Sequence, residues 1–171
     1  MVEQRQRVLD KMKLGRGDRI LDIGSGPGYL AQSMGKQVGS GGQVEGMDIS
    51  ESMCAIASNR CAAQLWVNFR VADAAKLPFD NDYFDVAVCT QVYEYVDDLG
   101  SALAELARVI KPGGRALVLD TDWGSIVWHS SNPERMQRVL KAWDEHLIDP
   151  YLPRTLGAKL IASGLNLVKV E

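Results

Sequence analysis

The strongest constraint on the fold is an apolar stretch that runs into three closely spaced glycines, at residues 20–30 (ILDIGSGPGYL). Short apolar runs of this kind form buried strands, and glycines let the following turn adopt backbone angles that a Cβ would forbid. Leu30, Met34 and Val38 recur every four residues, which predicts a helix that begins near Gly28. A strand, a glycine turn and a helix start with free N–H groups together indicate a place where polar ligand atoms bind.

The rest of the chain alternates between short β-branched runs and longer helical patterns, which is typical of a parallel sheet covered by helices. We therefore expect an α/β fold with a doubly wound, mostly parallel sheet and helices on both faces. Strands are predicted at residues 19–23, 43–48, 67–71, 85–90, 116–120 and 166–170. Further helices are predicted after an N-cap at Ser50, along the stripe of Leu99, Leu103, Leu106 and Ile110 until residues 111–114 (KPGG) stop it, and after Pro133.

Composition and charge exclude several classes of protein. Hydrophobic residues make up 46% and charged residues 24% of the 171 residues, which is typical of a globular chain and not of a disordered one. The net charge of −3 leaves no basic surplus, so we expect no nucleic-acid partner. No apolar run approaches the roughly 20 residues of a membrane-spanning helix, and the first residues lack the apolar core of a signal peptide, so we expect no membrane partner.

The cysteines indicate a reducing environment. Cys54, Cys61 and Cys89 are odd in number and match neither a disulfide framework nor a CxxC zinc site. We expect a cytoplasmic protein with a single domain over residues 1–171.

The glycine turn departs from a dinucleotide-binding pattern in two ways. Tyr29 stands where GxGxxG would have its last glycine, and Pro27 removes an N–H that a phosphate cradle would use. Asp22 lies just before the turn, where a carboxylate repels phosphate and attracts an ammonium group. A plain tight turn without a ligand is the alternative interpretation.

Two further acidic residues follow predicted strands. Asp48 ends the second strand, 24 residues after Gly24, where a carboxylate can hold both hydroxyls of a ribose. Asp73 and Ala74 follow the third strand, where a carboxylate can accept a hydrogen bond from an adenine amine. Asp48 could instead cap the next helix, although Ser50 is better placed for that role, and Asp73 could be an ordinary turn residue. All these strand ends meet at the carboxyl edge of a parallel sheet, where open α/β folds bind ligands.

At this point five stretches resemble a known family. The chain is similar to class I S-adenosylmethionine-dependent methyltransferases, in the small-molecule (type 11) branch that includes ubiquinone and menaquinone C-methyltransferases. The resemblance implies a Rossmann-like fold and transfer of a methyl group from S-adenosylmethionine to a small-molecule acceptor, with S-adenosylhomocysteine as product. The stretches are 21–28 (LDIGSGPG), 46–50 (GMDIS), 72–79 (ADAAKLPF), 84–96 (FDVAVCTQVYEYV) and 106–114 (LARVIKPGG).

The resemblance also implies roles for individual residues. Asp22 would help to hold the methionine ammonium, Asp48 the ribose hydroxyls, and Asp73 with Ala74 the adenine. Residues from about 15 to 120 would form the cofactor-binding half, and 121–171 part of the acceptor side. The implied cofactor-binding residues are Asp22, Gly24, Ser25, Gly26, Gly28, Asp48, Ile49, Asp73, Ala74 and Gln91.

Two departures from the family pattern concern catalysis and the sheet. Many relatives carry a Glu-His pair where this chain has Glu94 and Tyr95, which puts a histidine-assisted mechanism at that position in doubt. The family sheet normally ends with a hairpin of strands six and seven, whereas this sequence ends at Glu171 as the expected sixth strand finishes. We expect the last strand or strands to be missing, and the oligomeric state stays open.

Methyl transfer from a sulfonium is an in-line displacement, for which the protein mainly supplies proximity and alignment. An oxygen or nitrogen acceptor also needs a base. Asp120 and Asp122 follow the fifth strand beside Trp123, either in an acceptor pocket or in a solvated loop. Asp120, Asp122 and His129 do not form a tight ligand set, so we expect no metal site. The candidate catalytic residues are Tyr93, Tyr95, Asp120 and Asp122.

Two other functions compete with the methyltransferase hypothesis. One is a nicotinamide-dependent oxidoreductase, which the residues at Pro27 and Tyr29 disfavour. The other is a non-catalytic domain that retains the methyltransferase fold. Preference for S-adenosylmethionine over NAD would distinguish the methyltransferase hypothesis from the oxidoreductase. Turnover with a panel of acceptors would distinguish it from the non-catalytic domain.

Overall fold

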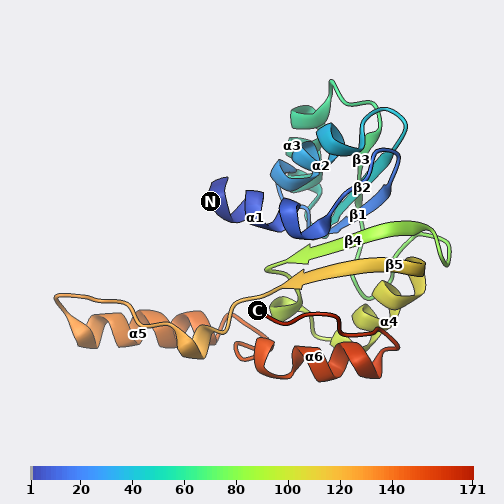
Figure 1. The fold of residues 1–171 in the computed structure, drawn as a ribbon. Coiled ribbons are helices and arrows are strands. Elements are labelled where there is room, and N and C mark those ends of the chain that lie inside the picture. Colours follow the sequence, from blue (N-terminus) through green and yellow to red (C-terminus); the bar gives the residue numbers. More distant parts are fainter. Residues whose placement is uncertain (1) are drawn as a thin grey trace.

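A computed structural model describes residues 2–171 and contains one five-stranded sheet. The strands lie in the order β3-β2-β1-β4-β5 and every neighbouring pair is parallel, which confirms the predicted doubly wound α/β fold (Figure 1). The first three strands have the predicted bounds. The strands are β1 (Arg19–Ile23), β2 (Gln43–Asp48), β3 (Val67–Val71), β4 (Phe84–Thr90) and β5 (Ile110–Leu119).

Helices lie on both faces of the sheet (Figure 1), because α1, α2, α3, α4 and α6 each bury apolar residues against it. Ser50 caps α3 as predicted, since its side chain accepts a hydrogen bond from the Met53 N–H. Helix α6 has no counterpart among the predicted helices. The helices are α1 (Val2–Met12), α2 (Tyr29–Val38), α3 (Glu51–Cys61), α4 (Leu99–Val109), α5 (Pro133–Asp144) and α6 (Pro153–Ala162), with short 3₁₀ turns η1 (Tyr93–Tyr95) and η2 (Trp123–Ser125).

Two apolar cores result from the alternation of side chains along the strands. Ile20 of β1 points to the core formed with α1, α2 and α3, whereas its neighbour Leu21 points to the core formed with α4 and α6. The central strands are buried on both faces, which explains why their sequences show so little polar alternation.

The start of β5 differs from the prediction. Residues 111–114 were expected to separate a helix from a strand at 116–120, but β5 already pairs at Ile110, directly after α4. Phe84 pairs with Ile110 and Val86 pairs with Arg115, so the intervening residues of β5 form an irregularity in the ladder. Ile110 therefore belongs to the strand and not to the helical stripe.

The predicted strand at 166–170 is wrong, because no strand follows α6 in the described part of the chain. Leu167 instead lies against α6, where its Cδ2 atom would be 3.2 Å from a Cβ on Gly157. Glu171 forms ion pairs with Lys11 of α1 and with Lys169. An apolar alternating segment forms a strand only where it gains ladder hydrogen bonds, and here residues 166–170 stay exposed, with Leu167 against α6.

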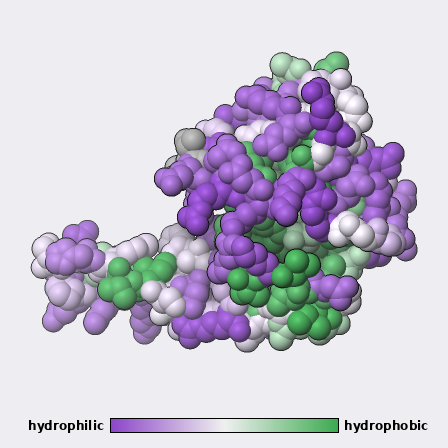
Figure 2. Space-filling view, in the orientation of Figure 1, coloured by the Kyte–Doolittle hydropathy of each residue, from purple (hydrophilic) through white to green (hydrophobic). Residues whose placement is uncertain are grey.

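Helix α5 projects from the body of the molecule (Figure 1). None of its residues is buried, although Met136, Val139, Leu140 and Trp143 recur with helical spacing. Hydrophobic atoms are therefore exposed on α5 (Figure 2). Its carboxyl end approaches the body, where the Trp143 ring lies 5.0 Å from the Trp123 ring.

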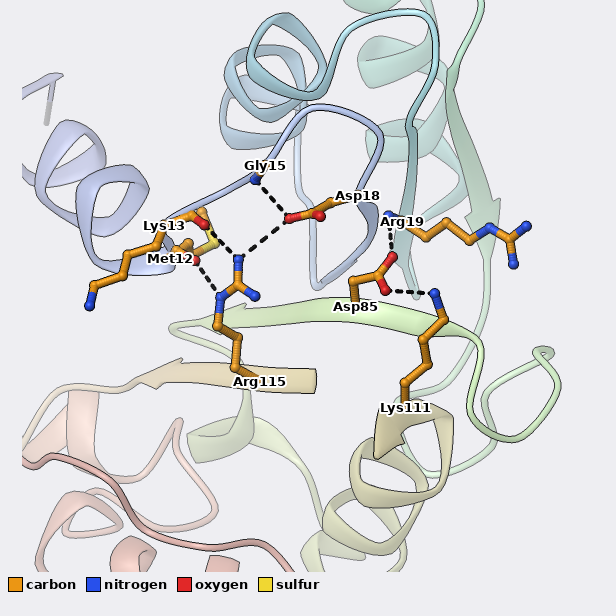
Figure 3. Close-up of polar contacts among 8 residues, drawn as sticks. All are labelled: Met12, Lys13, Gly15, Asp18, Arg19, Asp85, Lys111 and Arg115. Atoms are coloured by element: carbon orange, nitrogen blue, oxygen red, sulfur yellow. Dashed lines mark hydrogen bonds and ion pairs between the residues drawn. The ribbon is translucent and has the colours of Figure 1, made fainter. Parts of the chain in front are cut away.

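A group of polar contacts lies at the amino ends of the strands, opposite the carboxyl edge that carries the glycine turn (Figure 3). Arg115 of β5 donates to the carbonyl oxygens of Met12 (2.7 Å) and Lys13 (2.6 Å), which are carbonyls at the end of α1. Lys111 pairs with Asp85 at 2.6 Å. These contacts hold α1 and β5 together at the edge that lies farthest from the glycine turn.

Candidate functional site

The candidate site lies at the carboxyl edge of the sheet, beside the ends of β1 and β4. The strand order reverses there, since β2 lies on one side of β1 and β4 on the other. A crevice at such a switch point is the usual ligand site of open α/β sheets. The four segments that follow β1, β2, β4 and β5 carry most of the predicted site residues.

The glycine turn after β1 has the backbone angles that its sequence predicts. Gly24, Gly26 and Gly28 have φ values of 67°, 50° and 78°, which lie in the left-handed region that favours glycine. A Cβ at Gly24 would lie 2.1 Å from a methyl carbon of Val92, so the segment after β4 packs directly on the turn. A Cβ at Gly26 would meet no atom within 4 Å, so the turn is open at its middle glycine.

Asp48 at the end of β2 connects the glycine turn to the start of α3. Its Oδ2 accepts from the Gly26 N–H and its Oδ1 accepts from the Ser50 N–H, both at 2.9 Å. Each oxygen keeps a second lone pair, which two ribose hydroxyls can use. Because Ser50 itself caps α3, the alternative role of Asp48 as the helix cap is not needed. The next residue, Ile49, is 78% exposed and offers an apolar surface beside this carboxylate.

Asp22 is the buried carboxyl group beneath the turn. Its Oδ2 has no hydrogen-bond partner, and the Oγ of Ser25 is also buried without one. Burial raises the pKa of Asp22 to about 7, against the lowering effect of the Ala31 N–H, and the nearby Asp48 raises this pKa further. Two orphaned polar atoms next to an open glycine turn fit a ligand that brings hydrogen-bond donors, such as an ammonium group.

Asp73 and Ala74 follow β3 in a tight turn. The Oδ1 atom of Asp73 accepts from the Ala75 N–H at 2.8 Å, and Asp73 forms an isolated bridge with Lys76. Asp73 is exposed and Ala74 is buried. The geometry is therefore that of the turn aspartate in the alternative interpretation, with the second carboxylate oxygen still available to an amine.

Gln91, directly after β4, has a strained backbone. Its φ of 58° is unusual for a residue other than glycine, and its N–H donates to the Leu119 carbonyl at 2.7 Å. Its side-chain oxygen accepts from the Thr121 hydroxyl, also at 2.7 Å. The two hydrogen bonds of Gln91 join the segments that follow β4 and β5 at the carboxyl edge of the sheet.

Asp120 lies where β5 leaves the sheet. Its Oδ1 accepts from the Val92 N–H at 2.9 Å, whereas its Oδ2 is buried without a partner. Burial raises the pKa of Asp120 to about 6 against hydrogen bonds from the backbone, and the charge of Glu94 adds to the rise. A carboxyl group with a free oxygen and a pKa near neutrality is suited to accept a proton.

The other catalytic candidates lie in different surroundings. Tyr93 is fully buried in the core beneath α4, and burial raises its pKa well above the usual value. Asp122 pairs with Arg154 of α6 at 2.9 Å, which lowers the pKa of Asp122. Tyr95 is 39% exposed, and its ring lies 5.7 Å from that of His146. Of the four candidates, Asp120 and Tyr95 are therefore the two that are neither buried in the core nor held in an ion pair.

Sequence reasoning missed two residues that shape the site. Glu94 was noted only as a departure from the family pattern, but its carboxylate is fully buried and bonded to the segment after β5. Arg60 of α3 donates to the Pro27 carbonyl at 2.7 Å and lies 3.7 Å from the ring centroid of Tyr29, so it supports the glycine turn. Nothing in the local sequence around Arg60 indicates a contact with a residue 33 positions away.

The fold and the residues at these strand ends define a Rossmann-like α/β protein with a cofactor-type site at its switch point. Comparison with known proteins narrows the class, because residues 21–118 match the methyltransferase domain family. The chain belongs to this family, whose members use S-adenosylmethionine, and the matched region runs from β1, just before the glycine turn, into β5. The family membership leaves the nicotinamide-dependent alternative without support.

Three relatives illustrate the similarity. The chain is 42% identical over 107 residues to a 2-phytyl-1,4-naphtoquinone methyltransferase of Synechococcus elongatus, over 61% of this chain and 46% of the relative. It is 35% identical over 117 residues to a demethylmenaquinone methyltransferase of Staphylococcus epidermidis, over 68% of this chain and 48% of the relative. The crystal structure of a SAM-dependent methyltransferase from Aquifex aeolicus has the same fold, with a TM-score of 0.77 at 21% identity, over 97% of this chain and 81% of that one.

The chain spans about half the length of the curated relatives it matches. Among residues 2–171, no helix is long and apolar enough to cross a membrane.

Proposed function

We propose that this chain transfers a methyl group from S-adenosylmethionine to a small-molecule acceptor. The observation that carries the proposal is the buried carboxyl group of Asp22, which has an oxygen without a partner next to the open turn at Gly26. A buried unpaired carboxylate is costly, and the methionine ammonium of the cofactor offsets that cost. The family membership gives the same cofactor independently.

In this proposal the cofactor lies along the carboxyl edge of the sheet. Gly24, Ser25, Gly26 and Gly28 line its methionine and ribose, and Asp48 accepts from the ribose hydroxyls. Asp73, with Ala74 and the exposed Ile49, meets the adenine. Gln91 faces the methyl-transfer site. Residues from about 15 to 120 then form the cofactor half of one domain, and 121–171 form part of the acceptor side.

The chemistry asks little of the protein beyond alignment. The sulfonium carbon is already activated, so the site must hold the acceptor atom in line behind the methyl group. Where the acceptor carries a proton that must leave, we assign the base to Asp120, because its free Oδ2 lies beside the segment that carries Gln91. Tyr95 is the second candidate, since its ring is accessible at the same edge.

We propose an aromatic acceptor of the quinone type. The two quinone methyltransferases named above support this class, and so does a group of rings on the acceptor side. Trp123 lies against Trp143, and His146 lies within 6.0 Å of both Trp143 and Tyr95. Rings of this kind bind flat apolar molecules by offset stacking. We further propose that the protein is cytoplasmic and has no nucleic-acid partner, on its three free cysteines and its net charge of −3.

The test is methyl transfer from labelled S-adenosylmethionine to a panel of reduced naphthoquinones and benzoquinones. We expect labelled product with at least one quinone and an approximately hundredfold lower rate for Asp120→Asn, which cannot act as a base. The exposed Asp10→Asn on α1 is the matched control and should behave as the wild type. Binding of S-adenosylhomocysteine without transfer to any acceptor of the panel would favour the non-catalytic alternative.

A further inference from the structure

Glu94 joins three segments that lie far apart in the sequence. Its Oε2 accepts from the Thr121 N–H and from the Trp123 indole N–H, both at 3.1 Å. Its backbone carbonyl accepts from the N–H groups of Ile148 and Asp149, at 2.9 and 3.2 Å. The segment after β4 is thereby bonded to the segment after β5 and to the segment between α5 and α6.

A second carboxylate makes the reverse connection. Asp120, after β5, accepts from the N–H of Val92, after β4. Val92 in turn packs on Gly24, because a Cβ there would lie 2.1 Å from its methyl carbon. The carboxylates of Glu94 and Asp120 thus connect the segments after β4 and β5 in both directions. This network of contacts extends from the glycine turn to Trp123.

The chemistry of Glu94 does not suit a role in stability alone. It is fully buried, its Oε1 has no hydrogen-bond partner, and none of the ion pairs among the described residues includes it. A buried carboxylate without a cation costs free energy, and an apolar residue of similar size often serves packing equally well. What an apolar residue cannot do is accept the two N–H groups of Thr121 and Trp123.

We infer that Glu94 is a positioning residue, which fixes the acceptor-side rings relative to the cofactor turn through its bonds to Thr121 and Trp123. The inference rests on the proposed function, which identifies the rings as the acceptor side and the glycine turn as the cofactor side. That Glu94 joins these segments follows from the hydrogen bonds given above. None of the predicted catalytic roles includes Glu94.

The test compares Glu94→Met, which keeps the volume, with Glu94→Gln, which keeps an acceptor oxygen. Hydrogen exchange of the Trp123 indole N–H is followed by NMR, with Trp123→Phe to assign the signal. We expect roughly tenfold or faster exchange in Glu94→Met with a thermal midpoint no lower than the wild type, and near wild-type exchange in Glu94→Gln. Glu134→Gln, an exposed change on α5, is the control and should alter neither readout.

A functional experiment measures S-adenosylhomocysteine binding and acceptor kinetics separately. We expect S-adenosylhomocysteine affinity within about twofold of the wild type in Glu94→Met, because the cofactor-binding residues lie elsewhere. With the acceptor found by the transfer assay, KM for the acceptor should rise and Glu94→Gln should restore it. The exchange measurement needs no acceptor, so a failed acceptor screen and a failed positioning role give different results.

A Trp123 indole that stays protected in Glu94→Met would overturn the inference, as would equal exchange in the Met and Gln variants. If Glu94→Met does not fold, Glu94→Asp replaces it, since the shorter side chain keeps the charge and loses the reach. Fast exchange in Glu94→Asp with slow exchange in Glu94→Gln then supports positioning. The reverse order contradicts it.

Discussion

Asp48 is the residue whose geometry leads most directly to a measurable effect. Its carboxylate holds the Gly26 and Ser50 N–H groups and, in the proposed site, two ribose hydroxyls. Asp48→Ala should weaken S-adenosylhomocysteine binding by about 1.5–3 kcal/mol, the cost of losing hydrogen bonds to a charged group. Calorimetric titration measures this change, with the exposed Asp10→Ala as control. Unchanged affinity in a folded Asp48→Ala protein would refute the ribose role.

Asp22 predicts a dependence of cofactor binding on pH. Its pKa of about 7 means that the carboxyl group is partly protonated at neutral pH, whereas an ammonium ligand needs the ionised form. Affinity for S-adenosylhomocysteine should therefore rise about tenfold from pH 6 to pH 8. Asp22→Asn should bind more weakly and show a flatter profile. A pH-independent affinity in the wild type would contradict the ammonium role.

The same group sets the sign of a stability effect. The folded pKa of Asp22 lies above the usual aspartate value of 3.8, so the folded state binds more protons than the unfolded state between these two values. The contribution of Asp22 to the free energy of unfolding is therefore greatest below pH 3.8 and is lost as the pH rises to about 7. Urea denaturation at pH 5 and pH 8 should show a larger loss of stability in the wild type than in Asp22→Asn. An equal loss in both proteins would contradict the buried, unpaired state of this carboxyl group.

At the scale of residues, the sequence predicts backbone geometry better than burial. The positive φ values of Gly24, Gly26 and Gly28 follow from local spacing, and the Ser50 cap follows from its neighbours. The burial of Tyr93 in the core does not, because it depends on how α4 and the segment after β4 pack together. The hydrogen bonds of the Glu94 side chain cannot be predicted from the local sequence for the same reason, since their donors lie 27 and 29 positions away.

Among the elements, α1 depends on a side chain of β5, which is far from it in the sequence but adjacent in the fold. Arg115 of β5 donates to the carbonyls of Met12 and Lys13, which a helix leaves without partners at its end (Figure 3). Arg115→Ala should lower the free energy of unfolding by about 1–2 kcal/mol, the value of partly exposed charged hydrogen bonds. Urea denaturation measures this loss, and Arg135→Ala on the exposed surface of α5 is the control. Equal stability of the Arg115→Ala and control proteins would contradict the capping role.

Elements that are stabilised by their immediate neighbours were predicted well, and the others were not. The bounds of β1, β2 and β3 follow from apolar runs between turns. The sequence KPGG at residues 111–114 is a reasonable helix stop, and its inclusion in β5 depends on pairing with β4. The apolar alternation at 166–170 satisfies a strand pattern, but Leu167 lies against α6 and no ladder forms.

At the scale of the whole molecule, two apolar areas lie on the face that Figure 2 shows. One is the stripe on α5, and the other lies over α6 and the segment that follows it, where Ile161, Leu167, Val168 and Val170 are exposed (Figure 2). Both areas lie beyond residue 118, where the match to the family model ends. One face of the sheet, in contrast, is covered by α1, α2 and α3. The sequence predicts the half of the molecule that carries family motifs, and leaves the other half to tertiary packing.

The central claim is that the carboxyl edge of the sheet, beside the ends of β1 and β4, binds S-adenosylmethionine. Calorimetric titration of the chain with S-adenosylhomocysteine, and separately with NAD, tests it most directly. We predict saturable binding of S-adenosylhomocysteine at one site per chain and no heat of binding from NAD. Binding of NAD alone, or of neither compound to the folded chain, would contradict the claim.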